Sequence, residues 1–146
     1  MTREIVQNFA ILALLVLIQF SCASKDGANH APISVEEIVR SNKSWDGKLL
    51  VAYPHGQPEI TILRISIPAG ARLDTHSHPV INAGVLLSGQ LTVKTTDGQV
   101  LRLKAGDPIV EVVNTLHYGI NDGTVPAEII VFYAGIVGQA ITVSKQ

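Results

Sequence analysis

From residue 45 to residue 133, the chain is a series of short runs rich in aliphatic and β-branched residues, each ended by a turn signal. Runs of this length without a helical pattern between them predict the strands of an antiparallel sandwich or barrel. The pairs Asp97-Gly98 and Asp122-Gly123 indicate tight turns, because glycine adopts the positive φ that such turns need. We therefore predict an all-β fold, and the length of 146 residues fits one domain. The expected strands cover residues 49–53, 59–67, 85–94, 100–103, 109–113 and 129–133.

A short helix is expected before the strands. Ser34 and Glu37 have the spacing of a capping box, in which the two side chains satisfy backbone N–H groups at the start of a helix. A stripe of three apolar residues follows Ser34, and the polar pair Ser41-Asn42 is expected to end the helix. The sequence thus predicts one N-terminal helix on an otherwise all-β domain.

Two histidine segments stand out within the strand region. His76 and His78 alternate along the chain, so a strand would direct both side chains to one face. His117 comes from a later run and can close a pocket of three imidazole nitrogens. Three histidines with open coordination positions are typical of catalytic metal sites. We therefore predict that these three histidines bind a divalent metal.

The residues around the histidines resemble the two motifs of the cupin superfamily, and the chain is similar to small single-domain bacterial cupins over about residues 45–143. The resemblance implies a double-stranded β-helix, or jelly roll, with the histidines at the barrel mouth. Asn114 stands where glycine is usual, and because asparagine tolerates left-handed backbone we expect it to make the turn. The two segments read Gly70-x5-His76-x-His78-x3-Asn82-x6-Gly89 and Gly106-x5-Val112-x-Asn114-x2-His117-x3-Asn121.

Asn82 stands where cupins with a four-ligand site have a glutamate. Three imidazoles and a carboxamide are all neutral, so the metal would keep its full charge. Such a site disfavours Mn²⁺ and suits Zn²⁺, Fe²⁺, Ni²⁺ or Cu²⁺. We expect Asn82 to hydrogen-bond a metal-bound water rather than to bind the metal itself. Asn121, at the end of the second segment, is expected in the pocket or just outside the metal ligands.

The resemblance implies a metal-dependent enzyme on a small organic substrate, with dioxygenase, isomerase and lyase chemistry all open. No catalytic residue is assigned. The alternative is a non-catalytic, metal-free domain that binds a sugar or an organic acid in the same pocket. Glu111 is compatible with a surface ion pair or with a place in the pocket. Asp74, two residues before His76, is compatible with a turn or with orienting that imidazole.

The N-terminus carries an uninterrupted apolar run over residues 9–18. The run is too short for a permanent membrane span, which needs about 20 apolar residues. It predicts a secretory signal peptide cleaved after Ala23, or a lipoprotein signal whose lipid acceptor is Cys22. Residues 1–23 are then the signal, 24–33 a linker and 34–146 the domain, in a protein that is exported to the periplasm or anchored in the cell envelope. An uncleaved anchor or a core helix stays open.

Composition limits the partners. The formal net charge is -1, aromatic residues make up 5 %, and lysine and arginine do not cluster, so the sequence offers no surface for nucleic acid. Contact with a membrane is expected only through a lipid on Cys22. The expected partners are a small-molecule ligand and a second copy of the chain, because the apolar segment 136–143 could form the edge of a homodimer.

Overall fold

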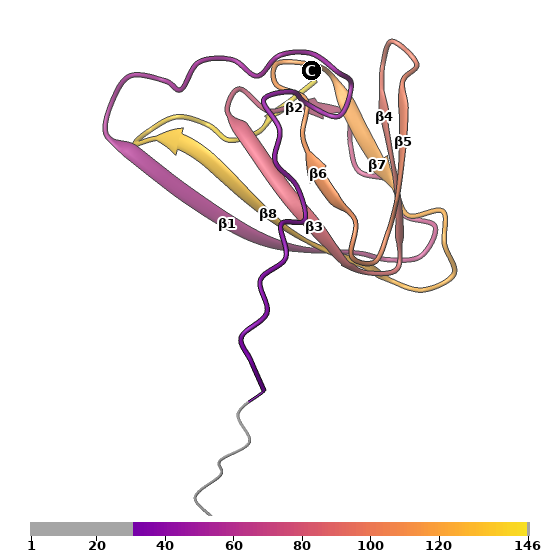
Figure 1. Ribbon diagram of the computed structural model, residues 1–146. Helices are drawn as coiled ribbons and strands as arrows, with labels where there is room; N and C mark the ends of the chain where they lie inside the picture. Colours follow the sequence, from indigo (N-terminus) through magenta and orange to yellow (C-terminus); the bar gives the residue numbers. More distant parts are fainter. Residues whose placement is uncertain (1–30, 146) are drawn as a thin grey trace, which may run out of the picture. The chain divides into compact units, whose positions relative to one another are not determined.

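The computed structural model describes residues 31–145, which contain nine strands and no helix, so the all-β prediction is confirmed (Figure 1). Within these residues there is accordingly no helix of the length and apolarity that a membrane span requires. The strands are β1 (Pro58–Ile67), β2 (His76–Ser77), β3 (Ile81–Ser88), β4 (Gln90–Thr95), β5 (Val100–Lys104), β6 (Pro108–Val110), β7 (His117–Ile120), β8 (Ala127–Ile136) and β9 (Val143–Ser144).

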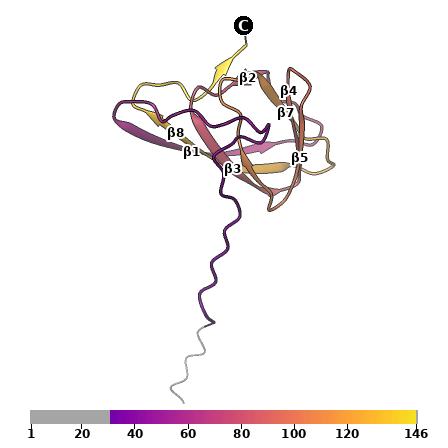
Figure 2. The ribbon, with the colours of Figure 1, turned by 45° about the horizontal axis from the view of Figure 1, so that its top comes forward.

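The strands form two antiparallel sheets, visible from two directions in Figures 1 and 2. One sheet has the order β1-β8-β3-β6, and the other has the order β5-β4-β7-β2-β9. Side chains from both sheets join in a single hydrophobic core. Its buried members are Ile67, Val80, Leu86, Leu91, Val93, Leu103, Ile109, Ala127, Ile129, Val131 and Tyr133.

Strand β8 is central to the first sheet, because it pairs with β1 along ten residues and with β3 on its other side. Its side chains alternate between buried and less buried positions, as expected for a strand with one face against a core. Ile129, Val131 and Tyr133 point into the core, whereas Phe132 is 49 % exposed. The alternation brings Tyr133 to the interior, next to the histidine segments.

The predicted strand 85–94 is two strands, and Gly89 separates them. Strand β3 belongs to the first sheet and β4 to the second, so the chain passes from one sheet to the other at Gly89. Gly89 has a φ of +74°. A Cβ at this position would lie 2.6 Å from the Pro126 carbonyl oxygen, which leaves no room for any side chain. Sequence alternation alone could not reveal this corner.

Two other expectations near the N-terminus are wrong. Residues 31–40 adopt no regular structure, so the helix predicted from Ser34 is absent. Ile38 is 52 % exposed and Glu37 bonds Arg40 instead of a backbone N–H, so an amphipathic stripe finds no surface to cover. A short helix without such packing is marginal in water. The predicted strand 49–53 is also not formed, since Leu49 makes only an isolated bridge with Lys43.

The predicted signal over residues 1–23, with its Cys22, lies outside the described residues, as do residues 24–30 of the predicted linker. Residues 31–33 have no helix or strand, and their side chains are exposed.

Candidate metal centre

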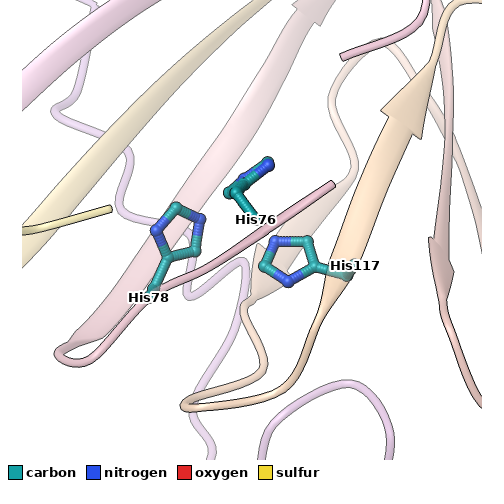
Figure 3. Close-up of side chains that lie close together, drawn as sticks. All are labelled: His76, His78 and His117. Atoms are coloured by element: carbon teal, nitrogen blue, oxygen red, sulfur yellow. The ribbon is translucent and has the colours of Figure 1, made fainter. Parts of the chain in front are cut away.

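The three predicted histidines lie together in the structure (Figure 3). His76 on β2 stands directly opposite His117 on β7 in the antiparallel pairing, and His78 follows two residues after His76. The ring centroids of His76 and His117 are 4.5 Å apart, and that of His78 lies 4.9 Å from His76 and 5.0 Å from His117. One nitrogen from each ring lies within 4.8 Å of the other two, so the group could hold a metal ion.

Each imidazole is fixed by a backbone carbonyl. The Nδ1–H of His76 donates to Asp74 O at 2.7 Å, that of His78 to Ile141 O at 2.8 Å, and that of His117 to Thr115 O at 2.8 Å. A carbonyl oxygen can only accept, so Nδ1 carries the proton in all three rings. The Nε2 atoms therefore keep free lone pairs, which is the tautomer that a metal-binding histidine needs.

The turn between β6 and β7 ties the two histidine segments together. Asn114 has a φ of +54°, so the expectation that it replaces glycine in a left-handed turn is confirmed. Its N–H donates to the His78 carbonyl at 2.8 Å. The bond that orients His76 comes from the backbone carbonyl of Asp74, so it does not depend on the carboxylate that the sequence left open.

His78 and His117 are buried, with 4 % and 2 % of their surface exposed. Burial lowers the pKa of His78 to about 4, and the neighbouring His117 and His76 add to this effect, while the bond to Ile141 O opposes it. His78 is therefore neutral at pH 7. A neutral imidazole is the form that binds a metal, so His78 needs to lose no proton before it can bind a cation.

The low pKa of His78 predicts a loss of stability in acid for the metal-free protein. The unfolded chain takes up a proton near pH 6.5, whereas folded His78 takes it up near pH 4, so the free energy of unfolding falls as the pH drops between these values. The loss attributable to His78 should approach roughly 3 kcal/mol. Urea unfolding with chelator, at intervals between pH 7 and pH 4, measures it. A His78→Gln variant should lose less stability over this range, and equal slopes would contradict the assignment.

Asn82 lies on β3 with 1 % of its surface exposed. Its Nδ2 donates weakly to Val80 O at 3.3 Å, while its Oδ1 has no hydrogen-bond partner among the residues that the structure describes. Buried polar atoms are nearly always paired, so this oxygen is available to accept a hydrogen bond from water or a ligand in the cavity. Asn82 is thus in the predicted pocket, with one acceptor available.

The cavity enclosed by these residues has a volume of about 50 Å³. Its walls are mainly aliphatic, and its polar lining residues are His76, His78, Asn82, Glu111, His117 and Tyr133. On the scale at which one water needs roughly 10–15 Å³, this space holds an ion with a few waters, or a ligand of few atoms.

The sequence left the place of Glu111 open, and the structure puts it in the cavity wall with Tyr133. Glu111 Oε1 lies 3.8 Å from His117 Nε2. Burial, with the neighbouring Glu111 charge, raises the pKa of Tyr133 to about 12, so its hydroxyl stays protonated. Sequence reasoning missed Trp45, whose Nε1 donates to Glu111 Oε2 at 3.1 Å.

Asn121, expected in the pocket or just outside the metal ligands, is not among the residues that line the cavity. Its Nδ2 donates to Ile67 O and Val125 O, both at 2.9 Å, and its Oδ1 accepts from the Gly123 N–H at 3.0 Å. The side chain is fully buried. Asn121 therefore ties the loop that follows β7 to the end of β1, which is a structural role.

Two antiparallel sheets around three converging imidazoles define a histidine-lined jelly roll with a candidate metal centre. A comparison with protein families is more specific, because residues 63–133 match the family described as the cupin domain. The matched residues include both histidine segments, so this part of the chain is similar to the cupin domain, in keeping with the motifs. No curated protein matches the chain.

Solved structures share the fold at low sequence identity. An oxalate oxidase in complex with the substrate analogue glycolate is 19 % identical, with 58 % of this chain and 45 % of that chain covered and a TM-score of 0.50. A DMSP lyase from Ruegeria pomeroyi DSS-3 is 21 % identical, with 59 % and 43 % covered and a TM-score of 0.52. The chain thus spans less than half the length of these two proteins.

Another match covers most of the other protein's length. That protein is an uncharacterized conserved protein with a double-stranded β-helix domain from Klebsiella pneumoniae subsp. pneumoniae MGH 78578, which is 23 % identical. The match covers 66 % of this chain and 90 % of that chain, with a TM-score of 0.50. These likenesses establish the jelly-roll fold.

Proposed function

We propose that this chain binds one divalent transition metal through the Nε2 atoms of His76, His78 and His117, and that the metal serves a reaction on a small organic substrate. The observation that carries the proposal is the set of three Nδ1–H bonds to backbone carbonyls. Three imidazole rings rarely converge on one point in the same tautomer by chance. They leave three lone pairs to which no donor within residues 31–145 is directed.

The chemistry of the donors limits the metal. Neutral imidazole nitrogens suit Zn²⁺, Fe²⁺, Ni²⁺ and Cu²⁺, whereas Mg²⁺, Ca²⁺ and Mn²⁺ prefer carboxylate oxygens. The carboxamide of Asn82 adds no charge to the set. When bound, such a metal supplies Lewis acidity, which polarises a substrate oxygen or lowers the pKa of a bound water.

The surrounding residues would orient the substrate and exclude water. Asn82 Oδ1 can accept a hydrogen bond from a hydroxyl or water in the cavity, because no donor in the described part of the chain bonds it. The Tyr133 hydroxyl, with its raised pKa, can act as a donor but not as an anion at neutral pH. Aliphatic walls, among them Ile65, Leu73 and Val131, limit solvent around the reacting atoms.

The size of the cavity favours a substrate of few atoms. A volume of about 50 Å³ is well below the several hundred Å³ typical of sites for drug-sized ligands, which favours a small organic acid over a sugar as the ligand. A small anion with two oxygen donors fits a centre with neutral ligands and a positive charge. The neighbours named for oxalate, glycolate and DMSP are in keeping with a small carboxylate substrate, with oxidation, isomerisation and lyase reactions as the candidate chemistry.

We also propose that the protein is exported. The apolar run at residues 9–18 and Cys22 support delivery to the periplasm or a lipid anchor in the cell envelope. Mass spectrometry of the mature N-terminus, after cell fractionation, distinguishes cleavage after Ala23 from lipidation of Cys22. A mature chain that keeps Met1 in the cytoplasmic fraction would refute export.

Metal analysis tests the metal-binding part directly. Protein purified without a His-tag and incubated in turn with Zn²⁺, Fe²⁺, Ni²⁺ and Cu²⁺ should retain about one equivalent of at least one of them after desalting. Mg²⁺ and Ca²⁺ should not be retained, because their preferred carboxylate ligands are absent from the histidine set. Less than a tenth of an equivalent of every transition metal would refute the proposal.

A further inference from the structure

Glu111 directly follows β6, and continuing the register of β3 and β6 by one residue puts it opposite Asn82. Strands β3 and β6 are antiparallel with Ala83 opposite Val110, and the Glu111 N–H donates to the Asn82 carbonyl at 3.0 Å. Directly opposed residues of antiparallel strands project to the same face, with their Cβ atoms roughly 4.5–5.5 Å apart. Both side chains accordingly line the same cavity, so a carboxylate is available one strand away from the neutral Asn82.

The carboxylate of Glu111 is held by one oxygen only. Its Oε2 accepts hydrogen bonds from Trp45 Nε1 and from the Val112 N–H, both at 3.1 Å. Its Oε1 lies 3.8 Å from His117 Nε2, the nitrogen left free by the bond to Thr115 O. With 9 % of the residue exposed, the side chain is fixed with its second oxygen toward the histidines.

The position of Glu111 also brings a negative charge to the cavity. Glu111 is the only acidic residue among those that line the cavity in the described part of the chain. Three neutral imidazoles leave a divalent ion with its full charge, and an unbalanced charge in a buried site is costly. Glu111 does not belong to the group of atoms within 4.8 Å of one another, so it lies beside the three nitrogens rather than among them.

We propose that Glu111 supplies the negative charge of the metal centre from the strand beside Asn82, and that this charge sets the affinity of a site whose three ligands are neutral. The inference rests on the proposed metal binding. It assigns Glu111 as a positioning residue that acts through electrostatic attraction and through water or ligand in the cavity, with Trp45 and Val112 holding it in place. The competing explanation is an ion pair between Glu111 and a protonated His117 that has no part in metal binding.

The decisive variant is Glu111→Gln, which keeps the shape and the acceptor oxygen but removes the charge. Competition with a chromophoric chelator at pH 7 should show Zn²⁺ affinity reduced by about 10- to 100-fold, the range found for residues that support metal ligands. In the double variant Asn82→Glu/Glu111→Gln the charge returns to the same face, so most of the lost affinity should be regained. The exposed Glu59→Gln is the matched control and should bind Zn²⁺ as the wild type does.

The outcomes separate the two proposals. If the wild type binds Zn²⁺ and Glu111→Gln binds equally well, the inference is wrong while metal binding stands. If the wild type binds no transition metal, both fail. A double variant that folds but regains no affinity would also contradict a role through charge.

A second measurement needs no variant and covers the case in which Glu111→Gln does not fold. Trp45 is the single tryptophan of the chain, and it donates to Glu111. Zn²⁺ bound at the histidines should attract the Glu111 carboxylate and thereby change the fluorescence emission of Trp45. The change in emission should saturate at one equivalent of Zn²⁺. Zn²⁺ binding that leaves the emission unchanged would overturn the inference.

Discussion

Replacing His117 by alanine should reduce transition-metal affinity by at least about 100-fold, which is the largest functional effect expected of a single substitution in this chain. His117 contributes one of the three free Nε2 atoms, and its ring is 2 % exposed and fixed by Thr115 O. Two histidines cannot enclose the ion in the same geometry. A loss beyond the 10- to 100-fold typical of supporting residues is therefore expected.

The measurement is a metal titration by chelator competition, with circular dichroism to confirm that the variant is folded. His55 offers a matched control, because it is exposed and far from the cavity lining. His55→Ala should bind metal like the wild type. A folded His117→Ala variant that retains half of the wild-type metal content would show that the ion lies elsewhere.

Replacing Asn121 by alanine should destabilise the fold by about 3–5 kcal/mol without altering the metal site. The substitution leaves the carbonyls of Ile67 and Val125 and the N–H of Gly123 without their partner. Each buried group that loses its partner costs roughly 1–3 kcal/mol, and the deleted amide also leaves a cavity. Urea unfolding followed by tryptophan fluorescence gives the change in unfolding free energy.

Asn121→Asp separates the hydrogen bonds from the packing. Aspartate keeps an acceptor for the Gly123 N–H but loses the donor to Ile67 O and Val125 O, so it should also destabilise the protein strongly. The folded fraction of both variants should bind metal with wild-type affinity, because Asn121 is outside the cavity. Loss of metal affinity in a folded Asn121→Ala variant would restore the role beside the ligands that the sequence suggested.

Much of the fold and the histidine group could be predicted because both depend on local periodicity. Alternation with a period of two identified β1 and the inner part of β8, and the same period put His76 and His78 on one side. The cupin motifs added His117, which no local rule could have paired with them. The short strands β2 and β7, which carry His76 and His117, are two and four residues long, too short to be recognised from composition.

The expectations that differ from the structure depended on tertiary contacts, which a local sequence pattern does not reveal. The capping box at Ser34 is a correct local signal, but the helix has no surface to pack on. Gly89 ends a strand because the backbone of Pro126 lies against it from another part of the chain. Asn121 matched a motif position, and only its three hydrogen bonds show that it ties a loop to the end of β1 instead of lining the pocket.

The sequence by itself determined the fold class and the three imidazoles, because strand alternation and motif spacing are properties of short stretches of chain. Only the tertiary structure decided the tautomer of the imidazoles and the position of the negatively charged carboxylate beside them. The tautomer of His78 depends on Ile141, 63 residues away, and the orientation of Glu111 depends on Trp45, 66 residues away. Contacts across such separations arise when the two sheets close around their core, and for this reason the carboxylate beside Asn82 became visible only in the folded protein.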